Sequence, residues 1–154
     1  MHGKDKPQSA SADYVVGLTD GEGCFYVLVK NSLHYRAGAA VNLHFHIKMQ
    51  AADRNVLESI KRTLKCGSVY FQHETRPNHT QCYRYTVAAN RDIIGKIIPF
   101  FEKHSLLSSS KRKNFRIFKE IALLVKANKH LTIMGLKKIR SLKKQMNQRV
   151  GGLA

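Results

Sequence analysis

Two acidic residues stand in a glycine-rich stretch near the start of the chain, in the segment VVGLTDGEG. The apolar residues that precede Asp20 and Glu22 predict a helix, and Gly21 and Gly23 predict that it ends close to the two acids. A carboxylate at a helix C-terminus faces the unfavourable end of the helix dipole. Carboxylate and carbonyl oxygens are the ligands that Mg²⁺ prefers, so the pattern indicates a divalent-cation site. The alternative is that both acids are simply solvated after the end of the helix. Within the helix, the small residue Gly17 would let a second helix approach closely.

A second chemical signal is the positive charge. The 154 residues include 27 Lys and Arg against 10 Asp and Glu, which gives a formal net charge of +17. The excess is concentrated from residue 103 onward, where Glu120 is the single acid. Such a field attracts polyanions, and neutralisation of nucleic-acid phosphates is its usual use. A tail that aids solubility or binds membrane phosphates is the alternative, but no basic helix with an aromatic apolar face is evident.

Length and composition narrow the class of protein. The chain has the length of one domain, and we expect a mobile arm over residues 1–10, one domain over residues 11–149 and a short tail over residues 150–154. No apolar stretch is long enough for a membrane span, and the N-terminus lacks the apolar core of a secretory signal. Three cysteines without a CxxC pair argue against a disulfide framework. We therefore expect an intracellular, reducing compartment, either prokaryotic cytoplasm or an organelle.

The periodicity of apolar residues predicts an α+β fold in the order αββαββα with further C-terminal helices. Val41, Leu43, Phe45 and Ile47 alternate with polar residues, as in a strand with one buried face. Strands are predicted over residues 24–30, 40–49, 68–74 and 81–87. A first helix is predicted from residue 11 or 13, and a helix capped by Asn90 is predicted to run to residue 101. The other helices are predicted over residues 53–65, 111–126 and 132–148. Four antiparallel strands with all helices on one face leave the other face of the sheet free.

Alternation assigns side chains to the two faces of this sheet. Val69, Phe71, Tyr83, Tyr85 and Val87 are expected to face the core. The expected free face is polar and mostly cationic or neutral, with Glu74 as the exception; it carries Tyr26, Lys30, Asn42, His44, His46, Lys48, Tyr70, Gln72 and Arg84. A strand pair can enter the major groove of DNA, where such side chains read base edges. An ordinary solvated face is the alternative.

The segment VVGLTDGEG resembles the signature motif of the LAGLIDADG homing endonucleases. It matches that motif at Gly17, Leu18, Asp20 and Gly23, and Gly21 and Glu22 are common family variants. The resemblance extends over roughly residues 13–146, and it includes GCFY from the last residue of the motif onward, FHI in the second strand, CGSVY leading into the third, and IIPFF. The fold expected from periodicity is the fold of this family.

The resemblance implies a metal-dependent DNA endonuclease. In this family two motif helices pack against each other, and the last acid of each motif binds the metal. The matching residue here is Glu22, with the backbone carbonyl of Gly21 as a second ligand. The implied cofactor is Mg²⁺, with Mn²⁺ as a substitute. One motif per chain implies a homodimer with Val16, Gly17 and Asp20 at its interface. The implied activity is a double-strand break in a long, near-palindromic duplex by the product of a mobile intron.

Two further active-site positions follow from the resemblance. The family has a lysine close to the scissile phosphate, and the matching segment offers Lys111, with Lys113 as the alternative. The family also has a glutamine after the second strand. Met49 stands there in this chain, with Gln50 beside it, so that either Gln50 enters the pocket or the polar contact is missing.

Other functions remain as alternatives. The isolated cysteines and the pair His44 and His46 do not form a typical zinc motif. A binding protein without cleavage, either a maturase that takes intron RNA or a regulator, would share the fold, but the metal carboxylate at Glu22 favours the nuclease. A basic RNA-associated protein would explain the charge and leave the two acids in the glycine-rich stretch unexplained.

Overall fold

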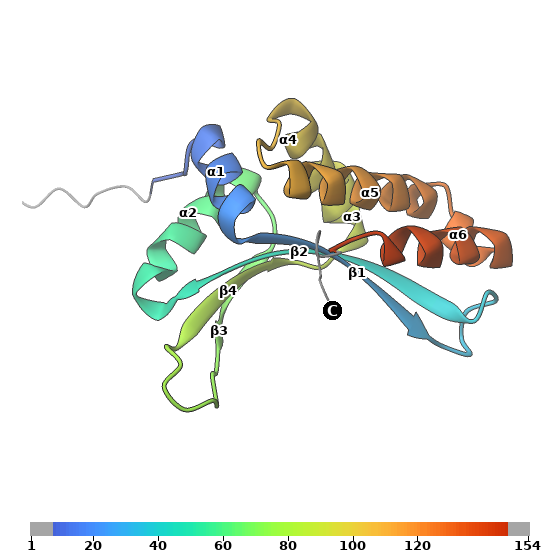
Figure 1. Ribbon diagram of the computed structural model, residues 1–154, viewed down its shortest axis with the longest axis horizontal. Helices are drawn as coiled ribbons and strands as arrows, with labels where there is room; N and C mark the ends of the chain where they lie inside the picture. The colour runs from blue at the N-terminus through green and yellow to red at the C-terminus, as the bar shows by residue number, and fades with distance from the viewer. Residues whose placement is uncertain (1–7, 148–154) are drawn as a thin grey trace, which may run out of the picture.

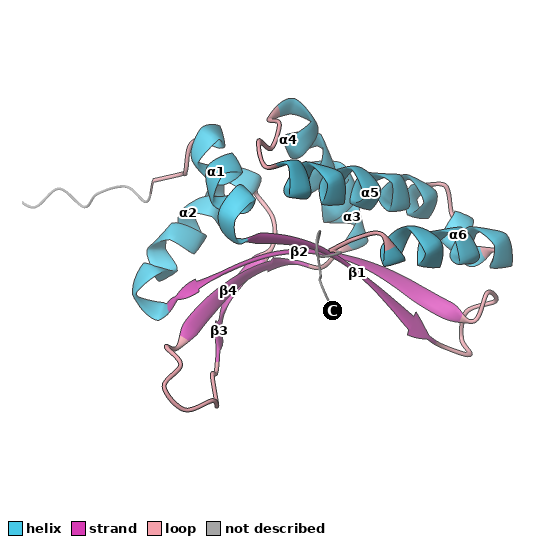
Figure 2. Ribbon diagram, viewed as in Figure 1, coloured by secondary structure: helices cyan, strands magenta, loops and turns pink. Residues whose placement is uncertain are grey.

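A computed structural model describes residues 8–147 of the chain. It contains one antiparallel sheet of four strands in the order β1-β2-β4-β3, with the helices packed against one face and the opposite face concave (Figure 1). The strands are β1 (Gly23–Asn31), β2 (Ala39–Gln50), β3 (Ser68–Gln72) and β4 (Cys82–Val87). The α+β class and the single helical layer expected from the sequence are confirmed (Figure 2).

The helices have the positions that the periodicity predicted, with small shifts at their ends. They are α1 (Ala12–Glu22), η1 (Ala51–Asp53), α2 (Arg54–Leu64), α3 (Asn90–Asp92), η2 (Ile93–Ile97), α4 (Ile98–Lys103), α5 (Ser109–Lys126), η3 (Lys129–Leu131) and α6 (Ile133–Lys144). Side-chain oxygens of Ser11, Ser108 and Thr132 accept hydrogen bonds from backbone N–H groups in the first turns of α1, α5 and α6. None of the described helices is both long and apolar enough to cross a membrane.

Strand β2 is the centre of the sheet. It pairs with β1 from Gly23 opposite Ile47 to Asn31 opposite Ala39, and with β4 from Phe45 opposite Val87 to Gln50 opposite Cys82. Its alternating apolar side chains, Val41, Leu43, Phe45 and Ile47, are buried as predicted. Side chains of the other parity therefore point from β2 to the concave face.

The core lies between the sheet and the helical layer. The ring of Phe25 on β1 contacts the rings of Phe45, Phe101 and Phe118, with ring centroids 5.2, 5.5 and 5.2 Å apart. These residues come from β1, β2, α4 and α5, so burial of this aromatic cluster joins the sheet to the C-terminal helices.

Two predictions about individual side chains are wrong. Phe71 was expected in the core but is 47% exposed, because it lies near the loop end of the edge strand β3, where it packs against the ring of Tyr83. Asn90 was expected to cap a helix. Instead its side chain accepts a hydrogen bond from the N–H of Leu43 and donates one to the carbonyl of Val41, where the pairing of β2 with β4 has already ended.

The start of the described chain is attached to α2 rather than projecting as an arm. Ala10 donates its N–H to the carbonyl of Ser59, and the side chains of Arg62 and Thr63 donate to the carbonyls of Gln8 and Ala10. The rest of the predicted arm and the predicted tail over residues 150–154 lie outside the described residues.

Candidate active site and nucleic-acid interface

The candidate metal ligand Glu22 is the last residue of α1. The helix continues through Gly21, where the sequence predicted a sharp turn, and the chain enters β1 at Gly23 with extended backbone angles. A Cβ atom on Gly23 would lie 2.6 Å from Cγ2 of Thr19 and 2.8 Å from its carbonyl oxygen, so close packing explains this glycine. Glu22 is exposed and forms no hydrogen bond or ion pair with any described residue. Its carboxylate is therefore available to a ligand.

The lysine of the candidate site is brought to the same place by α5. The ammonium group of Lys111 donates a hydrogen bond to the backbone carbonyl of Gly23, the residue directly after Glu22. Lys113, the alternative from the sequence, is exposed and makes no such contact, since a side chain two positions along a helix points about 200° away. The geometry therefore favours Lys111 as the partner of Glu22.

Asp20 fixes the loop from which α5 starts. Its two carboxylate oxygens accept hydrogen bonds from the N–H groups of Leu107 and Ser108, at 3.0 and 3.2 Å. The hydroxyl of Ser108 in turn accepts from the N–H of Lys111. Asp20 is thus engaged inside the chain, and it connects the helix that ends at Glu22 to the helix that carries Lys111.

Gln50 makes its side-chain hydrogen bond to a near neighbour in the chain. Its side-chain amide donates to the carboxylate of Asp53 at 3.0 Å, and its neighbour across the sheet is Cys82 on β4. Within the described chain Gln50 makes no hydrogen bond to Glu22 or Lys111, and Met49 is half-buried against the core. Neither residue therefore makes a polar contact with Glu22 or Lys111 in the described structure, and the role assigned to Gln50 from the sequence stays a prediction.

The donor set fits a hard divalent cation that is held by few protein ligands. Each chain offers the free carboxylate of Glu22 and the carbonyl of Gly21, which lies in the last helical turn where carbonyls lack intrahelical donors. The described residues contain no cluster of three His, Cys, Asp or Glu side chains that would hold a metal by itself. Mg²⁺ commonly takes one or two carboxylates and completes its shell with water and phosphate oxygens, so this sparse set suits it.

The predicted dimer residues divide into two groups. Val16 is 8% exposed and packs in the core of its own chain, and the carboxylate of Asp20 accepts hydrogen bonds from the loop before α5. Gly17 is exposed, and a Cβ atom there would meet nothing within 4 Å. The same is true of Gly21, and the ring of Tyr14 is 48% exposed. The open surface of α1 is therefore formed by Tyr14, Gly17 and Gly21.

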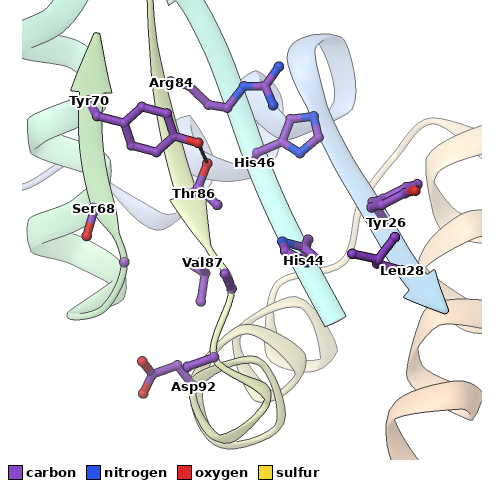
Figure 3. A pocket seen from close by; sticks show the side chains of 13 residues that line it. Tyr26, Leu28, His44, His46, Ser68, Tyr70, Arg84, Thr86, Val87 and Asp92 are labelled. Carbon is purple, nitrogen blue, oxygen red and sulfur yellow. Dashed lines mark hydrogen bonds between the residues drawn. The ribbon is translucent and has the colours of Figure 1, made fainter. Parts of the chain in front are cut away.

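The concave face of the sheet contains a hollow of about 860 Å³. Figure 3 shows the side chains that line it, which come from all four strands and from α3. Of the predicted interface residues, the hollow brings together Tyr26, His44, His46, Tyr70 and Arg84. Lys30 and Asn42 lie further along the β1–β2 hairpin, and Lys48 and Gln72 lie towards the opposite end of the sheet.

The hollow is lined by one cationic side chain, Arg84, one acidic side chain, Asp92, and two imidazoles. Burial lowers the pKa of His46 to about 4, and the positive charges of Arg84 and Lys111 act in the same direction. Burial also lowers the pKa of His44. Nε of Arg84 is buried without a hydrogen-bond partner in the described structure. Neutral imidazoles beside an unsatisfied guanidinium donor are suited to hydrogen bonds with a ligand's acceptor atoms.

Some residues of this face are absent from the sequence-based prediction. The hollow is also lined by Leu28, Ser68, Thr86 and Asp92, and the hydroxyls of Tyr70 and Thr86 are 3.2 Å apart (Figure 3). The strand alternation that selected Tyr26 also selects Leu28 and places Thr86 on the same outer face. Asp92 follows the last strand and could not be placed by alternation.

Comparison with known proteins assigns the family. The family model described as LAGLIDADG endonuclease matches residues 15–122, and the chain belongs to this family. A probable intron-encoded endonuclease 2 of Neurospora crassa is 32% identical over 137 residues, which cover 87% of this chain and 28% of that protein. This chain therefore spans less than a third of the length of that relative.

Solved structures show the same fold. The crystal structure of the homing endonuclease I-TnaI aligns with a TM-score of 0.81 and 33% identity over 93% of this chain and 92% of that one. I-SmaMI bound to cleaved DNA aligns with a TM-score of 0.79 and 34% identity over 89% of this chain and 44% of that one. I-SmaMI has also been solved on an uncleaved DNA target in the presence of calcium ions, at a TM-score of 0.81.

Proposed function

We propose that this chain is a site-specific DNA endonuclease. Two copies would act as a homodimer and make a metal-dependent double-strand break in a long, near-palindromic target, as expected for the product of a mobile intron. The observation that carries the proposal is the contact of the Lys111 ammonium with the carbonyl of Gly23, the residue directly after Glu22, whose carboxylate has no partner among the described residues. These groups stand where α1 meets a concave, basic sheet face whose shape and chemistry suit duplex DNA.

The reaction would use the residues of the chain in distinct roles. Glu22 and the carbonyl of Gly21 would hold Mg²⁺ or Mn²⁺; when bound, the ion makes water a stronger nucleophile and neutralises charge at the phosphate. Lys111 would offer its ammonium protons to the non-bridging phosphate oxygens as negative charge develops. The hydrogen bonds of Asp20 to the loop before α5 would hold that ammonium in place.

The dimer is supported by the surface of α1 and by the proportions of a relative. Gly17 and Gly21 have open space beside them, so the backbone of a second helix can approach closely. This chain aligns with 44% of I-SmaMI, about half of that chain. Two copies related by a two-fold axis would present one Glu22 to each DNA strand, and the two half-sites of the target would then be nearly identical.

Cleavage of a library of near-palindromic duplexes, in Mg²⁺ and in EDTA, tests this proposal. Glu22→Gln should abolish cutting, whereas Glu120→Gln, the same change on an exposed acid of α5, should leave it intact. Lys111→Met should slow cutting by roughly a hundredfold or more, and Lys113→Met should have little effect. Sedimentation at micromolar concentration should give the mass of two chains.

Different failures of this experiment have different meanings. Sequence-specific binding without cutting in any metal would indicate a regulator or a maturase on the same fold, and binding of intron RNA would then be measured. Equal cutting by wild type and Glu22→Gln would remove Glu22 from the reaction. A monomer that cuts one strand would overturn the homodimer.

A further inference from the structure

An acidic side chain, Glu74, lies in the loop that joins β3 and β4, beside the cationic face of the sheet. Its Oε1 accepts a hydrogen bond from Nε of Arg76 at 2.9 Å, and its Oε2 accepts one from Nη2 at 3.0 Å. Nζ of Lys48, on the concave face of β2, is 3.8 Å from the same carboxylate. A carboxylate at a surface suited to phosphates is unfavourable unless it has a task, so this pair requires an explanation.

Glu74 is held firmly, while Arg76 is left accessible. The N–H of Glu74 donates to the side-chain oxygen of Gln81, and its carbonyl accepts from the side-chain NH₂ of Gln81. The side chain of Glu74 is 11% exposed and that of Arg76 is 63% exposed. The hydrogen bonds from Arg76 lower the pKa of Glu74 to about 2, so the carboxylate is ionised at any assay pH. A fixed, charged anchor therefore orients a guanidinium that faces solvent.

The atoms used in this pair determine what the arginine can still bind. A guanidinium has five N–H donors in a planar fork, and Glu74 occupies the edge formed by Nε and Nη2. The edge formed by Nη1 and Nη2 keeps two donors side by side. Two such donors match O6 and N7 of guanine in the major groove, the commonest specific contact between arginine and DNA. A phosphate can accept from the same two donors, but such a contact carries no sequence information, so a preference for guanine at one position distinguishes the two.

The loop is placed to reach DNA. Figure 1 shows it extending beyond the ends of β3 and β4, on the side of the sheet opposite the helices. Resting on the proposed function, we infer that Arg76 reads a guanine in each half-site of the target and that Glu74 is the positioning residue that presents its free edge. The sequence indicated only a turn at this place, because the pairing of residues 74 and 76 depends on the loop conformation.

The preferred base at each position of the target, measured by sequencing duplexes cut from a randomised library, tests this inference. The wild type should favour guanine at one pair of symmetry-related positions, by roughly tenfold or more in each half-site. Arg76→Lys keeps the charge and removes the fork, so it should abolish that preference and no other. Glu74→Gln should weaken the preference at the same positions. Arg116→Lys, the matched change on the exposed surface of α5, should leave the whole profile unchanged.

Two results would overturn the inference, and both differ from failure of the proposed function. If Arg76→Lys lowers cutting equally for all sequences, or leaves every preference intact, Arg76 does not read a base. If Glu74→Gln leaves the guanine preference at full strength, Glu74 does not position the arginine. If the wild type binds but cuts nothing, the same comparison is made on bound duplexes. Equal melting temperatures of the variants exclude unfolding as the cause.

Discussion

Replacement of Asp20 by asparagine tests whether one carboxylate connects α1 to the start of α5. The two hydrogen bonds, at 3.0 and 3.2 Å, come from the N–H groups of Leu107 and Ser108. Hydrogen bonds to a charged group contribute about 1.5–3 kcal/mol each. Asparagine keeps one acceptor oxygen, while its NH₂ group would face an N–H donor. We therefore expect the free energy of unfolding to fall by about 2 kcal/mol and the melting temperature by about 4–8 °C.

The same substitution should affect the candidate reaction through Lys111. Loss of one anchor releases the loop whose Ser108 caps α5, so we expect single-turnover cleavage to slow by roughly tenfold, with DNA affinity unchanged. Urea unfolding at one protein concentration and amide exchange at Leu107 and Ser108 measure the structural part. Glu120→Gln removes the same charge from an exposed site and is the control. An unfolding free energy no lower than that of the control would show that the contact does not hold the loop.

Three more predictions concern stability. Gly23→Ala should destabilise the fold by about 1–3 kcal/mol in urea unfolding, because the new Cβ meets Thr19 at 2.6 Å. Gly17→Ala should be neutral or stabilising in the monomer. An equal fall in the free energy of unfolding for both variants would contradict the packing described here. The pKa of His46 is lowered from 6.5 to about 4 in the folded chain. As pH falls below 6.5, His46 therefore binds a proton in the unfolded chain while it stays neutral in the folded chain. The free energy of unfolding should therefore decrease between pH 6.5 and 4, by about 1–2 kcal/mol after allowance for partial exposure, and His46→Gln should remove this part of the slope. Asn90→Ala should lower stability by about 2 kcal/mol or more, since it leaves an N–H and a carbonyl of β2 without partners; an unchanged urea midpoint would refute this.

The sequence was sufficient for the elements, the sheet faces and the family, because each depends on local periodicity or on a contiguous motif. Alternation in β2 correctly placed Phe45 in the core and His46 on the opposite face. The errors fall where a distant segment decides. Asn90 bonds to a strand some fifty positions earlier in the chain, and Phe71 is exposed near the loop end of the edge strand. The alternation of apolar and polar residues along the chain predicts neither the hydrogen bonds of Asn90 nor the exposure of Phe71.

The candidate site shows the same division. The motif indicated Glu22 directly, but the choice between Lys111 and Lys113 required the contact of the Lys111 ammonium with the carbonyl of Gly23. The motif predicts Asp20 at a dimer interface, which stays a prediction; the structure adds its hydrogen bonds to a loop almost ninety positions later. Arg76 has no local signal, because its orientation comes from a side-chain pair inside a loop.

The contacts between α1 and α5 have a mechanical consequence. Asp20 and Lys111 connect the end of one helix to the beginning of another, and neither contact involves β3 or β4. Duplexes differ in groove width and curvature from one sequence to the next, so a reading surface gains from compliance. Under the proposed function, the groups that act on the phosphate are joined to one another across α1, the start of β1 and α5, while the β3–β4 loop that carries Arg76 lies outside those contacts. Base reading and bond cleavage would then depend on separate parts of a small domain.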